Sequence, residues 1–249
     1  MKLYHGTAGH NVRAMLRHGI KPRGKRGGNW KHTVDSNPNA VYLTSTYAPY
    51  FVYNAVNRSS LLGIVEIETD KLDESLLIPD EDFLEQSTRG MKWKSRLIAR
   101  ELRGLQLKQR TEWFRTHASF WQEHWQRSLD YLGTCAYLGT IPPAAITRGV
   151  TFDWKKNTRL GTEMVQPTIT RENFKFCGDG YRAMTRWLLG DKVTADEIQG
   201  SLLNLSKIQE SLGAKPPAEW KPFLEAAQQR TQILEEALAD RSGITVLKS

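Results

Sequence analysis

The first residues with an evident capacity for chemistry form the stretch YHGT at positions 4–7. A histidine ring can donate or accept hydrogen bonds, and a glycine lets the backbone approach a ligand closely. Two more aromatic residues, Tyr42 and Tyr53, lie eleven positions apart in VYLTSTYAPYFVY. A histidine near a strand end or aromatics in a core are equally compatible with a structural role. A nucleotide pocket is therefore a hypothesis that several stretches must support together.

Three stretches in order resemble the NAD-binding core of ADP-ribosyltransferases, the group that includes diphtheria toxin and the poly-ADP-ribose polymerases. They are YHGT followed by a helical pattern and GIKP, then VYLTSTYAPYFVYNA, then GIVEIET. The resemblance covers residues 3–70 and, loosely, 131–153. It implies an NAD-dependent mono-ADP-ribosyltransferase, a glycosyltransferase that uses NAD as a substrate and transfers ADP-ribose to a macromolecular acceptor. We favour nucleic acid over protein as that acceptor.

The resemblance also implies roles for individual residues. A strand histidine holds ribose hydroxyls, the next glycine bonds the carboxamide through its backbone, and two tyrosine rings enclose the nicotinamide by stacking. Tyr47 or Tyr50 can replace Tyr53 in this scheme. The residues so assigned to NAD binding are His5, Gly6, Thr7, Tyr42, Ser45 and Tyr53, and those assigned to catalysis are His5, Tyr42, Tyr53 and Thr134.

Thr134 stands where the family usually has a catalytic glutamate, and no acidic residue occurs between Tyr131 and Thr151. A threonine hydroxyl can bond a ribose but supplies no charge, so it lacks the electrostatic contribution of a carboxylate. Glu123, Asp130 and Glu163 are candidate replacements.

Two alternatives in function stay open. One is a catalytically inert nucleic-acid-binding protein on an ADP-ribosyltransferase scaffold. The other is an enzyme similar to the RNA 2′-phosphotransferases, which lack the glutamate, because CAYLGTIPPAAI resembles the end of those proteins.

The segment Arg89–Arg127 holds ten Lys and Arg against three acidic residues, within a chain whose formal net charge is +8. Cations for phosphates and aromatic rings for base stacking are the ingredients of nucleic-acid binding. A helical core stripe with a charged outer face explains the same pattern equally well. With that structural explanation still open, we expect RNA or DNA as a partner through this segment, alongside NAD. The aromatic residues concerned are Trp93, Trp113, Phe114, Phe120, Trp121 and Trp125.

A second basic stretch, KPRGKRGGNWKH, lies beside the expected pocket and suits a phosphate-bearing partner, the pyrophosphate of NAD or an acidic protein. Its cations are Lys21, Arg23, Lys25, Arg26 and Lys31.

The elements that must position these residues indicate an α+β protein. Residues 1–153 read as an ADP-ribosyltransferase-like split mixed β-sheet core, with an inserted basic helical segment over 86–130. The stretch AGHNVRAMLRHG, residues 8–19, predicts a helix with Asn11 as N-cap and a stop at Gly19. Residues 154–249 are expected to form a mainly helical C-terminal extension.

Composition limits the class of protein. Hydrophobic residues make up 39% and charged residues 25% of 249, which suits a packed core. Two cysteines, Cys135 and Cys177, favour a reducing compartment over a disulfide framework. No apolar run approaches the ~20 residues of a membrane helix, and the first residues do not resemble a secretory signal. We expect a soluble cytoplasmic protein with no membrane partner and no metal.

Overall fold

In the computed structural model, the stretches rich in β-branched and aromatic residues become strands of one sheet, as β-propensity predicts. The structure describes residues 1–24, 36–55, 61–84, 104–117, 124–153, 155–156, 171–199, 225 and 232–248. The strands are β1 (Lys2–Ala8), β2 (Ala40–Thr44), β3 (Leu61–Glu68), β4 (Leu77–Pro79), β5 (Thr134–Leu138), β6 (Ile146–Asp153) and β7 (Ile244–Lys248).

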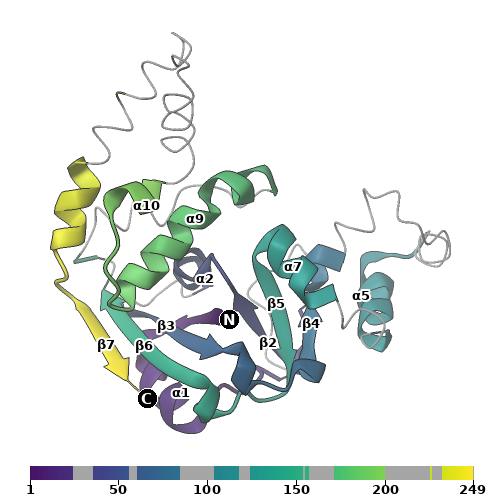
Figure 1. Ribbon diagram of the computed structural model, residues 1–249. Coiled ribbons are helices and arrows are strands. Elements are labelled where there is room, and N and C mark those ends of the chain that lie inside the picture. Colours follow the sequence, from purple (N-terminus) through teal and green to yellow (C-terminus); the bar gives the residue numbers. More distant parts are fainter. Residues whose placement is uncertain are drawn as a thin grey trace.

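Helices lie on both faces of this sheet (Figure 1). Asn11 precedes the first helix as predicted, but its side chain donates to the Thr7 hydroxyl instead of capping that helix. The helices are α1 (Val12–His18), α2 (Ala48–Ala55), α5 (Leu107–Thr116), α7 (Trp125–Leu132), α9 (Arg171–Leu188) and α10 (Ala195–Gln199), with further helical turns over 81–84 and 232–239. The 3₁₀ turns are Gly9–Asn11, Thr69–Lys71, Glu74–Leu76 and Pro143–Ala145.

The seven described strands follow the order β4-β5-β2-β1-β3-β6-β7, and every neighbouring pair is antiparallel. The expectation of a mixed sheet is therefore wrong for the described strands. Two parallel neighbours require a crossover connection that brings both strands in from the same end of the sheet, and no two neighbours among the described strands run in the same direction. The α+β class itself is confirmed. β1 pairs with β3 along its whole length but with β2 only at Tyr4–Thr44, so the sheet nearly divides there.

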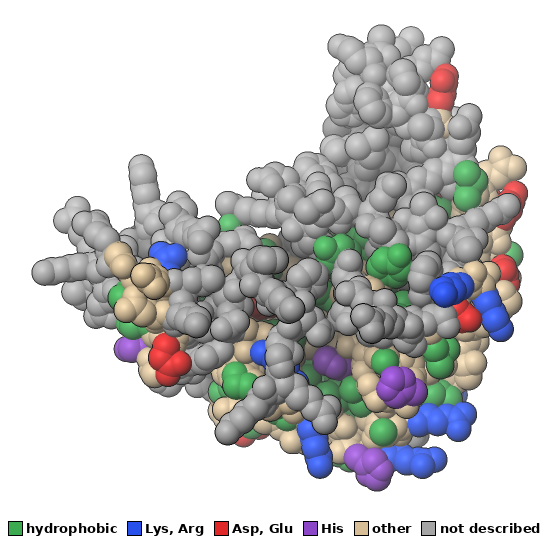
Figure 2. Space-filling view, turned by 180° about the vertical axis from the view of Figure 1, so that it is seen from behind, with side chains coloured by type: hydrophobic (Ala, Val, Ile, Leu, Met, Phe, Trp, Pro, Cys, Tyr) green, Lys and Arg blue, Asp and Glu red, His purple; other side chains and the backbone are tan. Residues whose placement is uncertain are grey.

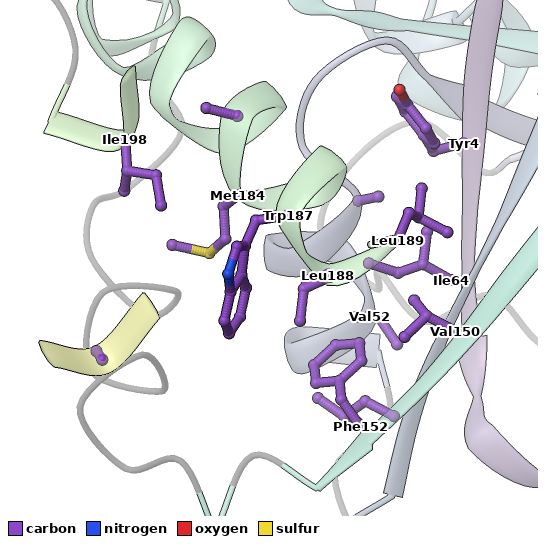
Figure 3. Packing of buried hydrophobic residues seen from close by; sticks show 14 of the residues in the cluster. Tyr4, Val52, Ile64, Val150, Phe152, Met184, Trp187, Leu188, Leu189 and Ile198 are labelled. Atoms are coloured by element: carbon purple, nitrogen blue, oxygen red, sulfur yellow. The ribbon is translucent and has the colours of Figure 1, made fainter. Parts of the chain in front are cut away.

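One face of the sheet is covered by α2 and α9. Side chains from β1, β3 and β6 pack there against α9, as Figure 3 shows for Ile64, Val150, Trp187 and Leu188. Leu234, from the helical turn 232–239, belongs to the same cluster. The expected C-terminal extension therefore completes the core that the first 153 residues begin.

The opposite face is covered by α1 and α7. Val12 and Leu129 are buried in one cluster with side chains of β2, β3 and β5. At the β4 edge, Trp113 of α5 packs against Phe83, and Figure 1 shows α5 beyond that edge.

β7 is a strand in a region expected to be mainly helical. It pairs with β6 from Arg148–Lys248 to Phe152–Ile244, at the edge opposite β4. Its five residues are too short a run to separate from the preceding helical pattern by periodicity alone.

Candidate active site at the division between β1 and β2

His5 lies where β1 and β2 stop pairing. Its ring Nδ1 is 2.9 Å from the carbonyl oxygen of Tyr42. Because a carbonyl only accepts, Nδ1 carries the hydrogen, and in a neutral ring Nε2 is then an acceptor. Burial lowers the pKa of His5, although the Tyr42 carbonyl acts in the opposite direction. The imidazole is therefore set up to accept a hydrogen bond from a hydroxyl group.

Gly6 allows α2 to pack directly on the backbone of β1. A Cβ at this position would lie 2.9 Å from the Cβ of Val52 and 3.3 Å from the carbonyl oxygen of Ala48. The start of α2 is held by Thr44, whose hydroxyl accepts hydrogen bonds from the backbone N–H groups of Thr46 and Tyr47. Any larger residue at position 6 would push the helix away from the strand.

Tyr42 projects from β2 into a polar cluster, on the same face of the sheet as Thr134 of β5. Its hydroxyl donates to Glu81 Oε2 at 2.6 Å and accepts from the backbone N–H of Asn37. The same N–H lies 3.0 Å from Glu81 Oε1. Burial, followed by the charge of Glu81, raises the pKa of Tyr42 far above its ordinary value, so it remains a phenol.

Glu81 is a nearly fully buried carboxyl group, with 4% of its surface exposed. Burial first, and the charge of Asp80 second, raise its pKa to about 7, while the bond from Tyr42 acts in the opposite direction. A carboxyl group that titrates near neutrality beside a polar cluster is a mark of a functional site. Neither acid was identified from the sequence, where PDED directly after a strand was the only available signal.

Asp80 brings a second carboxyl group to Thr134, the position of the missing glutamate. β4 and β5 are in register at Pro79–Cys135, so the next residues, Asp80 and Thr134, are neighbours. The Thr134 side chain hydrogen bonds to Asp80, which opposes the upward shift that burial imposes on the Asp80 pKa. Asp80 also caps the helical turn 81–84 by accepting from the N–H of Asp82 at 2.9 Å.

The three tyrosines proposed for the second half of the ring clamp differ in exposure. Tyr47 is 1% exposed and packs against Tyr181 at 5.3 Å between ring centroids, so it belongs to the core. Tyr50 and Tyr53 are both half-buried on α2. Tyr53 packs beside the cluster of β1, β3 and α9, whereas Tyr42 packs with Ile78 and Ala136. The rings of Tyr42 and Tyr53 are therefore supplied by different elements, β2 and α2.

Ser45 lies on the other side of the Tyr4–Thr44 pair from His5, at the end of β2. Its hydroxyl is 3.1 Å from that of Thr46, and its N–H donates to the carbonyl of Gly133. Ser45 opens into a groove of about 520 Å³ between α7 and α9. The other residues that line this groove are Met1, Lys2, Tyr4, Leu129, Asp130, Arg182 and Arg186.

The acids named from the sequence do not meet Thr134 within the described residues. Asp130 is exposed on α7 and lines the groove of Ser45. Glu123 and Glu163 lie outside the described residues. Among the described residues, Glu81 contacts Tyr42 and Asp80 contacts Thr134.

The basic segment 89–127 is described only over 104–117 and 124–127. Trp125 is 5% exposed and packs in the core, so its proposed role in base stacking is wrong. Trp113 is half-buried and stacks on His117, with 4.3 Å between ring centroids. Trp93, Phe120 and Trp121 lie outside the described residues, and the structure does not describe the side chain of Phe114.

The loop cations are only partly described. Arg23 donates to the carbonyl oxygen of Ser36 at 2.8 Å and ties the loop to the Asn37 region, and Lys21 is exposed. Lys25, Arg26 and Lys31 lie outside the described residues.

No family model matches the chain, and no curated protein matches it. Within the described residues there is no group of His, Cys, Asp and Glu suited to a metal ion. No helix in the described parts of the chain has the length and apolar character needed to cross a bilayer.

Proposed function

We propose that the chain binds NAD at the division between β1 and β2 and transfers ADP-ribose to a macromolecular acceptor. The observation that carries the proposal is the hydrogen bond from His5 Nδ1 to the Tyr42 carbonyl, which leaves Nε2 of the neutral ring as an acceptor. In this proposal, His5 accepts from a ribose hydroxyl and the Gly6 backbone bonds the carboxamide. Tyr42 and Tyr53 enclose the nicotinamide ring.

The reaction breaks the bond between the ribose C1′ and the nicotinamide nitrogen, and nicotinamide leaves with the bonding electrons. A nucleophilic atom of the acceptor then bonds to C1′ and gives up its proton. Positive charge develops on the ribose as the first bond lengthens, and a nearby fixed negative charge stabilises it.

In this proposal, Glu81 supplies the negative charge that a threonine at position 134 cannot supply. Its support is the bond from the Tyr42 hydroxyl at 2.6 Å and the contact of Thr134 with the adjacent Asp80. Because the pKa of Glu81 is about 7, the ionised form predominates only above neutrality. Transfer should therefore rise with pH through about 7.

The test measures nicotinamide release and the transfer of adenylate-labelled ADP-ribose to acceptors in a lysate, followed by nuclease or protease digestion. Wild type is compared with His5→Ala, Tyr53→Ala and Glu81→Gln, and with Glu74→Gln as a matched control for Glu81→Gln. Glu74 is exposed in a 3₁₀ turn, so its replacement should leave transfer unchanged. We expect the first two variants to lose most transfer and Glu81→Gln to lose both rate and pH dependence.

Equal labelling by wild type and His5→Ala would contradict the assignment of His5. The absence of NAD consumption by wild type with any lysate would favour a nucleic-acid-binding protein without chemistry. Nuclease-sensitive label would identify the acceptor as RNA or DNA, and protease-sensitive label would identify it as protein.

A further inference from the structure

A basic stretch other than the segment 89–127 lies near the first residue of the chain. Residues 1–34 contain eight Lys and Arg and no Asp or Glu. The other 215 residues contain 27 basic and 27 acidic side chains and are balanced. The formal net charge of +8 therefore equals the charge of these first residues, and its place on the surface decides what the protein attracts.

The rotation of α1 on the sheet is set by Val12, which is fully buried. Val12 rests on two glycines of neighbouring strands: a Cβ at Gly63 would lie 2.3 Å from its Cγ2, and a Cβ at Gly149 would lie 2.6 Å from its Cγ1. The absence of side chains on β3 and β6 at these points lets the helix lie close. With this face against the sheet, the residues on the opposite side of α1 are directed to solvent.

The exposed side chains on and beside α1 form what we call the α1 basic face. Figure 2 shows the molecule from behind relative to Figure 1, and Lys, Arg and His side chains gather on the lower part of that face. Arg13 and Arg17 are four positions apart, so they lie about one helical turn from each other, about 6 Å along the helix axis. The α1 basic face consists of His10, Arg13, Arg17, His18 and Lys21, all exposed.

The cations of this face are not neutralised by the described part of the protein. No ion pair within the described residues includes Arg13, Arg17 or Lys21. By contrast, Arg148 pairs with Glu66 and Asp191. Within the described parts of the chain, the guanidinium groups of α1 are therefore left to an external anion.

We propose that the α1 basic face binds the phosphate backbone of a nucleic-acid duplex. Arg and Lys side chains that contact phosphates release counterions, which gives affinity without base recognition. The face consists of three cations and two histidines, which suits contacts with phosphates more than stacking on unpaired bases. This binding goes beyond NAD chemistry and requires none of it, and its site on α1 is separate from the segment 89–127.

The experiment measures the dissociation constant for 20-bp mixed-sequence DNA and RNA duplexes from 50 to 300 mM salt. Wild type is compared with the double variant Arg13→Gln/Arg17→Gln. A charge-matched control is Lys155→Gln/Lys156→Gln, at two exposed lysines after β6. Each lost phosphate contact lowers the slope of log K against log salt by about 0.9, so the arginine variant should lose about 1.8 in slope and bind about 60-fold more weakly at 0.1 M salt.

The proposal requires that the lysine variant lose less than about half as much slope as the arginine variant, that is, less than about 0.9. Binding of only one duplex type by wild type would still support the proposal and would identify the sugar. Equal slopes for wild type and the arginine variant would overturn it. The proposal would also be overturned if wild type bound neither duplex at 50 mM salt, or if these arginines bound phosphatidylserine vesicles and not the duplexes. All readouts are independent of nicotinamide release, so failure of the proposed transferase activity leaves this test intact.

Discussion

Replacing Glu81 with Gln should remove a pH dependence of stability that this one buried carboxyl group creates. The pKa of Glu81 is raised from 4.5 to about 7 in the folded chain. Between these values the folded chain holds a proton that the unfolded chain has released. The free energy of unfolding therefore falls as pH rises from about 4.5 to about 7 and changes no further above that range.

The size of this effect follows from the shift itself. Each pKa unit corresponds to 1.36 kcal/mol, so the contribution of Glu81 should change by about 3 kcal/mol across the window. Gln has the shape of the protonated acid and keeps an oxygen for the backbone N–H of Asn37, which is 3.0 Å from Glu81 Oε1. The buried Asp80 remains in both proteins, so the difference between them reports Glu81 together with its charge interaction with Asp80.

Urea unfolding followed by Trp fluorescence at pH 4.5–8 measures this difference. We expect the free energy of unfolding of wild type, relative to Glu81→Gln, to fall by about 3 kcal/mol between pH 4.5 and 7. Glu74 is exposed, so Glu74→Gln should follow the wild-type curve in parallel. Parallel curves for wild type and Glu81→Gln would refute the reasoning, because they would mean that Glu81 titrates alike in the folded and unfolded chains.

Four further substitutions test the packing and the ion pairs of the fold. Gly6→Ala should destabilise by about 1–3 kcal/mol and weaken NAD binding, because its Cβ would meet α2 at 2.9 Å; an unchanged Tm would contradict this close contact. Arg148→Met should cost about 3–5 kcal/mol by leaving the buried Glu66 without its main partner, whereas Lys2→Met, at a half-exposed partner, should cost about 1 kcal/mol or less. Similar losses for both would mean that Glu66 does not depend on Arg148. Leu188→Ala should cost about 2–5 kcal/mol with an unchanged m-value in urea unfolding, and a loss below 1 kcal/mol would exclude α9 from the core.

Much of the local structure could be predicted from the residues because it depends on short-range patterns. The strand over Leu61–Glu68 and the helix that ends before Gly19 agree with the pattern of apolar and turn residues. β7 could not be predicted, since a five-residue strand is stabilised by the edge of β6 more than by its own sequence. Trp125 could be assigned to the core or to a surface only when α7 was placed against the sheet.

The sequence by itself determined the kinds of chemistry available: an imidazole next to a glycine, two phenol rings eleven positions apart, and an excess of cations before residue 35. Only the tertiary structure decided which groups meet. Glu81 contacts Tyr42, 39 positions away, because β4, β5 and β2 are neighbours in the sheet. Such a contact depends on strand order and register, which arise from packing across the whole chain and leave no trace in the spacing of the residues themselves.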